Sequence, residues 1–181
     1  VARHRLGQPD RLDPLLAARP LVTAGVVVVT SDRGMAGAYN TNVIRLAEGR
    51  LKEHAAAGIS FRLYVVGKKA LSYFRYGGYR IERSFLGMTD SPAYEDAREI
   101  GKALMTDYES GAVDVVEAFS TRYLSGFSQV AAARRILPVG TPEGAEEHAA
   151  VPYSYEPEAA VLLARLLPSY VEGAVFGISQ V

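Results

Sequence analysis

The sequence predicts an α/β protein: an open, doubly wound sheet of about five mostly parallel strands flanked by helices. Segments with strand-like and helix-like patterns alternate along most of the chain, which is typical of this class. The unbroken apolar run Val26–Val29 suits a strand that is buried on both faces. A glycine turn and a segment of helical periodicity follow it directly, as in the first unit of such a sheet.

Composition places the chain among ordinary globular domains. Its 181 residues are 49% hydrophobic and 22% charged, with zero formal net charge, so nothing indicates a global attraction to nucleic acid or anionic lipid. The absence of cysteine excludes disulfides and thiol catalysis. The three histidines are far apart, and no apolar run approaches the ~18–20 residues that span a bilayer. Because the first residue is Val1, we expect a fragment or a processed form.

The first half of the chain yields three strands and two helices. Residues 1–20 contain three prolines and are expected to be irregular, with a short helical piece at 13–19. The pattern then predicts a strand over 21–32, a helix from Tyr39 to Gly58, a strand over 61–66, a helix over 68–75 that Gly77-Gly78 ends, and a strand over 79–85.

The second half begins with a predicted helix over 91–110, capped by Ser91. Strands are predicted over 113–123 and 130–139. The segment between them is too short for a helical crossover, so we expect an antiparallel pair or one bent ribbon. The strongest helical pattern covers 156–181. Such a helix usually packs on its own domain, but the absence of a stop signal favours one that continues into a coiled coil.

The turn after the first strand is the first place to look for a ligand site, because ligands bind at the carboxyl ends of parallel strands. Gly34 and Gly37 match a dinucleotide fingerprint only in part, and no phosphate-binding Gly-Lys-Ser/Thr sequence follows. Lys68 and Lys69 stand where a dinucleotide site would carry an acid, so an NADP site through these lysines stays open. The favoured interpretation is a structural turn.

The polar residues of this turn have simple interpretations too. Asp32 has no acidic neighbour of the kind that a magnesium-dependent phosphoacceptor site needs. We therefore expect a helix N-terminal acid with local hydrogen bonds, with Arg33 as a possible partner. Ser31 lacks the Gly-x-Ser-x-Gly context of a nucleophile. Tyr153 and Tyr155 are candidate interface residues.

Three segments in order resemble one known family. Residues 31–40, SDRGMAGAYN, resemble the SDRGLxGxYN signature of the gamma subunit, the central rotor stalk, of F-type ATP synthases. Residues 113–138 are similar to the ribbon of that family. Residues 155–172 are similar to its YEPxxxxxLxxxLLPxYVE segment. The match runs from about residue 21 to 176, without most of the two shaft helices.

The resemblance implies the globular, Rossmann-like foot of a non-catalytic rotor subunit that needs no cofactor or metal. It implies binding to the epsilon subunit, the c-ring and the alpha/beta hexamer, and a peripheral position on the cytoplasmic face of the bacterial cell membrane. In that role it would couple proton-driven rotation of the c-ring to ATP synthesis at the beta subunits. The alternatives are an NADP-linked or other nucleotide-binding enzyme and a generic interaction module.

The resemblance also implies a division of the chain and a contact site. Residues 1–20 form a lead-in, residues 21–155 the α/β domain and residues 156–181 the start of the shaft helix. By family position, the loop before the YEP segment lies near the c-ring. The expected contact residues are Glu147, His148, Val151 and Tyr153.

Overall fold

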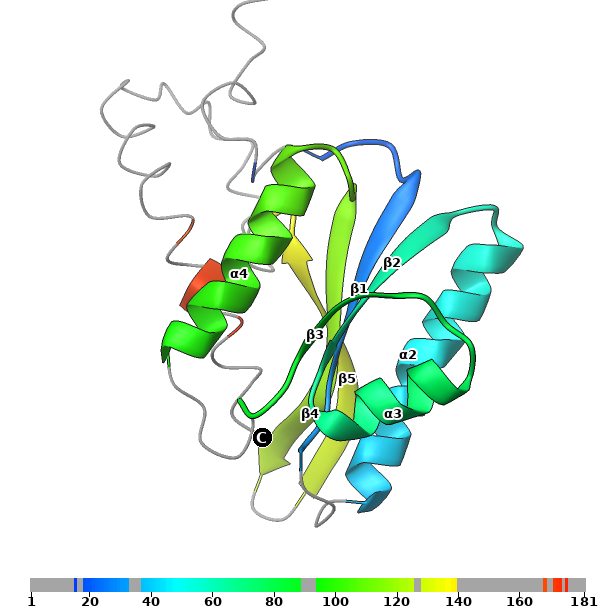
Figure 1. The fold of residues 1–181 in the computed structure, drawn as a ribbon, viewed down its shortest axis with the longest axis vertical. Helices are drawn as coiled ribbons and strands as arrows, with labels where there is room; N and C mark the ends of the chain where they lie inside the picture. Colours follow the sequence, from blue (N-terminus) through cyan, green and yellow to red (C-terminus); the bar gives the residue numbers. More distant parts are fainter. Residues whose placement is uncertain are drawn as a thin grey trace, which may run out of the picture.

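The computed structural model describes residues 15, 18–32, 37–88, 94–125, 128–139, 168, 171–173 and 175. They form a five-stranded sheet between two layers of helices (Figure 1). In chain order the elements are β1 (Thr23–Val29), α2 (Gly37–Ala56), β2 (Ser60–Val66), α3 (Lys68–Tyr76), β3 (Ile81–Phe85), α4 (Tyr94–Glu109), β4 (Val115–Ser125) and β5 (Ser128–Leu137).

The strand order is β3-β2-β1-β4-β5. Neighbouring strands are parallel except β4 and β5, which are antiparallel. The predicted α/β sheet is therefore confirmed, and so is the antiparallel last pair. From β1 through β2 to β3, the chain adds strands toward one edge of the sheet. After β3, α4 returns the chain to the opposite edge of β1, where β4 pairs. The strand order thus reverses between β1 and β4, which is the switch point of a doubly wound sheet.

Alternation along β1 builds two cores, one on each face of the sheet. Val26 and Val28 pack toward α2 and α3, whereas Val27 and Val29 pack toward α4. All four side chains are at most 3% exposed. A strand that is covered on both faces needs apolar residues at every position, and this explains the run of valines.

The cores also show how the helices are placed. The apolar stripe predicted for the first helix faces the sheet, and its members Val43, Ile44, Ala47 and Leu51 are buried. Ala55, at the end of the same stripe, is exposed. On the opposite face, α4 shares its core with Val171 and Val175, whose described neighbours are helical. The short segment that contains them lies beside α4 (Figure 1, red).

Some predicted features lie outside the described residues. They are the Ser91 cap, most of the helical piece predicted over 13–19, the loop over 140–150 and most of the helix predicted over 156–181. Of that last helix, the structure describes residues 168, 171–173 and 175, all in helical conformation.

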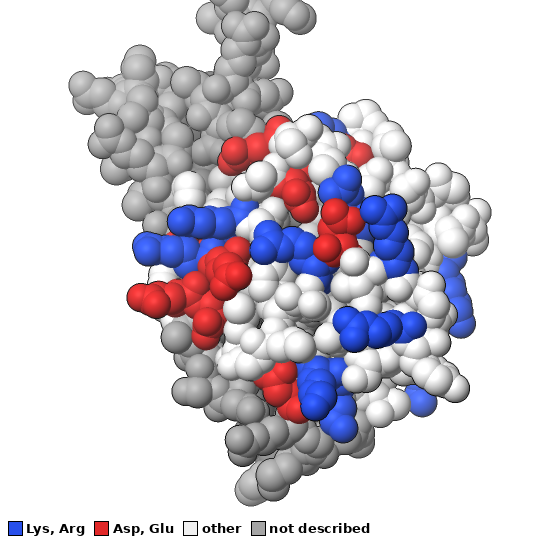
Figure 2. Space-filling view, in the orientation of Figure 1, with Lys and Arg blue, Asp and Glu red and all other residues white. Residues whose placement is uncertain are grey.

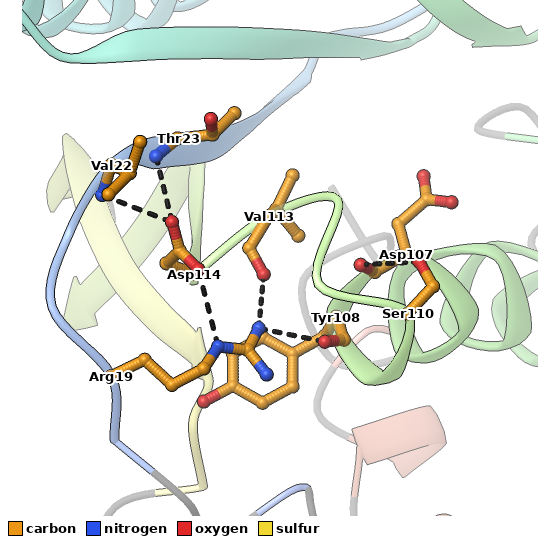
Figure 3. A network of polar contacts seen from close by, with 8 residues as sticks. All are labelled: Arg19, Val22, Thr23, Asp107, Tyr108, Ser110, Val113 and Asp114. Carbon is orange, nitrogen blue, oxygen red and sulfur yellow. Dashed lines mark hydrogen bonds and ion pairs between the residues drawn. The ribbon is translucent and has the colours of Figure 1, made fainter.

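A polar cluster at the amino edge of the sheet ties the segment before β1 to the core (Figure 3). The Arg19 guanidinium lies 4.2 Å from the ring centroid of the fully buried Tyr108. Its nitrogens donate to the carbonyl oxygens of Tyr108 and Val113, and Nε lies 3.2 Å from Oδ1 of Asp114. These bonds join the lead-in segment to the end of α4 and the start of β4.

Asp114 also caps the start of β1. Its Oδ2 accepts the backbone N–H groups of Val22 and Thr23, at 3.0 and 2.9 Å. Burial acts to raise the pKa of Asp114, but the two backbone donors and the Arg19 charge outweigh it and lower that pKa below its ordinary value. The ionised carboxylate is thus the form that the fold favours.

Candidate functional site

The carboxyl edge of the sheet is the place where the sequence predicts any ligand site. At this edge the structure describes Thr30, Ser31 and Asp32 after β1, and α2 from Gly37 onward. The residues between them, which include Gly34, lie outside the described residues. The question is what the described polar groups of this edge bind.

Ser31 and Asn40 bind each other. The backbone N–H of Ser31 donates to Oδ1 of Asn40 at 3.2 Å, and Nδ2 of Asn40 donates to Oγ of Ser31 at 2.8 Å. The Asn40 side chain is on the first turns of α2 and only 5% exposed. This pair of bonds fastens the end of β1 to the start of α2, which gives two polar residues of the SDRGMAGAYN motif a structural role.

The first turn of α3 takes its caps from the end of β1. An α-helix leaves its first backbone N–H groups without partners inside the helix. The N-cap of α3 is Gly67, which has no side chain to supply an acceptor. The buried Thr30 hydroxyl instead accepts the N–H of Ala70 at 2.9 Å, and the carbonyl oxygen of Ser31 accepts that of Lys69 at 3.4 Å.

Asp32 completes this arrangement. Its Oδ1 accepts the N–H of Lys68 at 3.1 Å, and its Oδ2 accepts the N–H of Gly87 at 3.1 Å. The sequence predicts a helix N-terminal acid with local hydrogen bonds here, and the two bonds of Asp32 described above reach distant parts of the chain instead. Asp32 caps α3, which begins 36 residues later, and binds the backbone of the segment after β3. Both lie close to Asp32 because they are at the same edge of the parallel sheet.

Close packing at Gly67 makes these bonds possible. The residue has φ 96° and ψ 148°, and its N–H donates to the carbonyl oxygen of Phe85 at 2.9 Å. A Cβ atom there would overlap the backbone carbonyl of Thr30 and lie 3.0 Å from its Oγ1. Only glycine therefore allows the end of β1 to reach the N-terminus of α3.

These contacts decide what the edge offers chemically. Helix N-terminal N–H groups bind phosphate when they are open to a ligand. The three donors of the first turn of α3 instead bind oxygens of residues 30–32. An anion at this helix end would also meet the Asp32 carboxylate. The capped first turn of α3 therefore supports a structural interpretation of this helix end, while the side chains of Lys68 and Lys69 are exposed.

At the switch point, the β4–β5 pair extends beyond the rest of the sheet. β1 pairs with β4 only as far as Val28 and Phe119. From Ser120 to Ser125, β4 pairs with β5 alone. This two-stranded ribbon reaches past the carboxyl end of β1, at the lower end of the sheet in Figure 1. At the switch point, the ribbon of β4 and β5 therefore lies beside the carboxyl end of β1.

Sequence reasoning missed an open groove between α2 and the edge strand β5. Two half-exposed apolar side chains mark it, Leu46 at 39% and Val130 at 42% exposure. Residues of both elements line it, namely Asn42, Arg45, Leu46, Gly49, Arg50, Glu53, Gln129, Val130 and Ala131. The signal was weak, since both apolar residues fit ordinary helix and strand patterns.

The predicted contact residues Glu147, His148, Val151 and Tyr153 lie outside the described residues, as does Tyr155. Of the tyrosines near the double glycine, Tyr76 is 96% exposed, whereas Tyr79 packs edge-on against Phe74. On the face in Figure 2, acidic and basic side chains are mixed at the left and centre, and the charged side chains along the right are basic.

Neither grouped metal ligands nor a membrane span occurs in the part of the chain that the structure describes. Within those ranges, no three His, Asp or Glu side chains are grouped in a way that could hold a metal ion. None of the helices described is both long and apolar enough to cross a bilayer.

Comparison with known proteins places the chain. Residues 2–180 match the family model described as ATP synthase. The chain is 40% identical over 176 residues to the ATP synthase gamma chain of Moorella thermoacetica, covering 97% of this chain and 61% of the relative. It is 39% identical over 172 residues to the gamma chain of Acidothermus cellulolyticus, covering 90% and 57%. The chain therefore spans about three fifths of the length of these relatives.

Solved structures agree on the fold. A chain in the central stalk and c-ring of the Tetrahymena thermophila mitochondrial ATP synthase matches with a TM-score of 0.65 at 16% identity, over 96% of this chain and 77% of that one. A chain in the rotor of the Euglena gracilis enzyme matches with a TM-score of 0.61 at 20% identity, over 99% and 72%.

Proposed function

The chain belongs to the ATP synthase gamma family, and on that basis we propose that it acts in the central stalk of an F-type ATP synthase. In this role it couples proton-driven rotation of the c-ring to ATP synthesis at the beta subunits. The chain itself carries out no chemistry. It is a rigid body that transmits rotation between other proteins.

The observation that carries this proposal is the shared core of the sheet and the C-terminal helical segment. Val171 is fully buried and Val175 is 6% exposed, and both pack in the cluster that contains Val27, Ile100 and Leu104. A helix that is packed into the core of a domain moves with that domain. This supports a body in which rotation of the helix carries the sheet with it.

The proposed organisation has three parts. Residues 1–20 lead into the domain, residues 21–155 form the α/β foot, and residues 156–181 begin a shaft helix. The Arg19 cluster and the packing of Leu15 in the core of the α4 face support a lead-in that is attached to the foot. The lead-in and the C-terminal segment then contact the same face of the sheet.

A non-catalytic role agrees with the carboxyl edge. Thr30 and Asp32 satisfy the N-terminus of α3, and the groups that would hold a phosphate there are bound within the protein. Thermal unfolding with NADP or ATP tests this point. A ligand at a hundred times its dissociation constant stabilises a protein by about 2.7 kcal/mol, so binding would raise the melting temperature clearly. We expect no shift, and a saturable shift would favour the enzyme alternative.

The proposed partners are the epsilon subunit, the c-ring and the alpha/beta hexamer. Through them the protein is peripheral to the cytoplasmic face of the bacterial cell membrane. We propose that the loop with Glu147, His148, Val151 and Tyr153 contacts the c-ring. Support comes from the position of this loop in the sequence of the family, since it directly precedes the YEP segment.

Assembly tests the partners. An affinity tag is added to this protein in its host, in the form that the host expresses. The membrane complex is then purified through the tag. We expect the hexamer, epsilon and the c-ring to be recovered together. Alanine at the four loop positions should reduce recovery of the c-ring and leave the hexamer, whereas alanine at the exposed Tyr76 serves as the matched surface control. Recovery of no ATP synthase subunit would contradict the proposed function.

A further inference from the structure

The contact between α4 and the C-terminal helical segment is built around one residue pair. Glu172 lies against Gly101 in the middle of α4. A Cβ atom on Gly101 would be 3.3 Å from Cγ of Glu172 and 3.6 Å from its Cα. Because the missing side chain leaves this space, the backbones of the two helices approach closely at this point.

Glu172 is also an unusual group to bury at a helix contact. Its side chain is 9% exposed. Its Oε2 lies 3.6 Å from Nε of Arg98 and 3.5 Å from the hydroxyl of Tyr94, both on α4. Burying a carboxylate is costly unless charged and polar partners offset it, and an apolar residue would fill the same space at lower cost. In some proteins a buried polar or charged residue is kept because it fixes the relative position of two helices.

The neighbouring residues restrict rotation of the segment about its own axis. Val171 and Val175 are four residues apart, so they lie on one face of a helix, and both enter the core that α4 covers. Glu172, the residue after Val171 on the same helix, contacts α4 directly. Gly173, the next residue, is exposed, and a Cβ atom added to it would meet no other atom within 4 Å. Among the described residues of the segment, Val171, Glu172 and Val175 are therefore held against the domain, while Gly173 is exposed.

We propose that Glu172 is a positioning residue that locks the rotational register of the C-terminal helix on the sheet domain. Arg98, Tyr94 and the space at Gly101 hold it in place. Torque is then transmitted between the helix and the foot through this contact. The inference rests on the proposed function, since load crosses the contact only if the protein turns as a rotor.

The first experiment uses the whole ATP synthase from the host, reconstituted into lipid vesicles. ATP hydrolysis and ATP-driven proton pumping are measured on the same sample, and their ratio reports coupling. Glu172→Ala and Gly101→Val should lower the ratio of pumping to hydrolysis while hydrolysis and subunit content are kept. The nearly isosteric Glu172→Gln, which keeps the packing, should lower it less. Gly173→Ala, at an exposed position of the same helix, should leave the ratio unchanged.

A rescue experiment separates register from loss of folding. The chain contains no cysteine, and a Cβ on residue 101 would lie within 3.6 Å of Cα of residue 172. The double variant Gly101→Cys, Glu172→Cys is therefore placed for a disulfide. With the thiols reduced, we expect weakened coupling, and oxidation should restore it. Gel mobility of the gamma chain reports whether the bond has formed.

Two results would overturn the inference. One is an unchanged ratio of pumping to hydrolysis in both Glu172→Ala and Gly101→Val. The other is a double-cysteine complex that is coupled equally well in its reduced and oxidised forms. A wild-type complex that lacks this chain, or does not pump with it, would instead contradict the proposed function itself. The two failures are thus told apart by the wild-type sample.

Discussion

Replacing Gly67 with alanine tests the closed carboxyl edge most sharply. The backbone at this position has φ 96° and ψ 148°, a conformation that residues with a side chain rarely adopt. The added methyl group would overlap the carbonyl of Thr30, which is backbone and cannot turn away. To accept it, the end of β1 and the start of α3 must separate.

The expected cost has two parts. A strained backbone conformation costs about 1–3 kcal/mol. Overpacking a tight site costs about 1–3 kcal/mol more. The free energy of unfolding should therefore fall by about 2–6 kcal/mol, a large share of the ~5–15 kcal/mol of a typical domain. Hydrogen bonds from the N-terminus of α3 to Thr30 and Asp32 would weaken in the same step.

Two other glycines serve as matched controls. Gly58 also has a positive φ, 73°, but nothing lies within 4 Å of its Cβ position, so alanine there should cost only about 1–2 kcal/mol. Gly49 is helical, exposed and equally open, and alanine there should stabilise by roughly 0.5–1 kcal/mol. Urea unfolding of the four proteins gives the free energies. If Gly67→Ala costs no more than Gly58→Ala, the close approach described here is wrong.

Three further predictions concern single groups, each measured by urea unfolding. Thr30→Val keeps the shape but removes the acceptor of the Ala70 N–H, and should cost about 1–3 kcal/mol, whereas Thr30→Ser should largely retain stability. The pKa of Asp114 is lowered in the fold, so its contribution to the free energy of unfolding is complete above the ordinary pKa of 3.8 and is lost as pH falls through the folded pKa. The difference in stability between wild type and Asp114→Asn should therefore close over that range. A constant difference would refute the assignment. Burial, the hydrogen bond to Asp107 and its charge raise the pKa of Tyr64 above its ordinary 10.0, so the unfolded chain releases a proton that the folded chain keeps. Stability should therefore decline above about pH 10, and Tyr64→Phe should decline less.

Much of the fold follows from local patterns in the sequence. The valines of β1 predict a strand covered on both faces, and both cores confirm it. The link between β4 and β5 is too short for a helical crossover, and of the two expected arrangements the structure shows the antiparallel pair. Gly77 and Gly78 end α3 as predicted, because the chain turns there with positive φ at Gly78.

The contacts at the site were harder to predict, because they join residues that are distant in sequence. Nothing in the pattern around Asp32 indicates that it binds the N–H groups of Lys68 and Gly87. The fit of Glu172 against Gly101 depends on how two helices cross, and an apolar stripe does not specify that crossing. Sequence periodicity gives the face of each element, whereas these contacts need the three-dimensional arrangement of several elements.

Direct observation of rotation tests the central claim. The chain has no cysteine, and Tyr76 at the end of α3 is 96% exposed, so Tyr76→Cys gives a single attachment point on the foot. The alpha/beta hexamer of the purified complex is fixed to a surface, and a probe on this cysteine is followed while ATP is supplied. We predict that the probe turns continuously in one direction. A probe that stays still while the same complex hydrolyses ATP would contradict the proposal that this chain is part of the rotor.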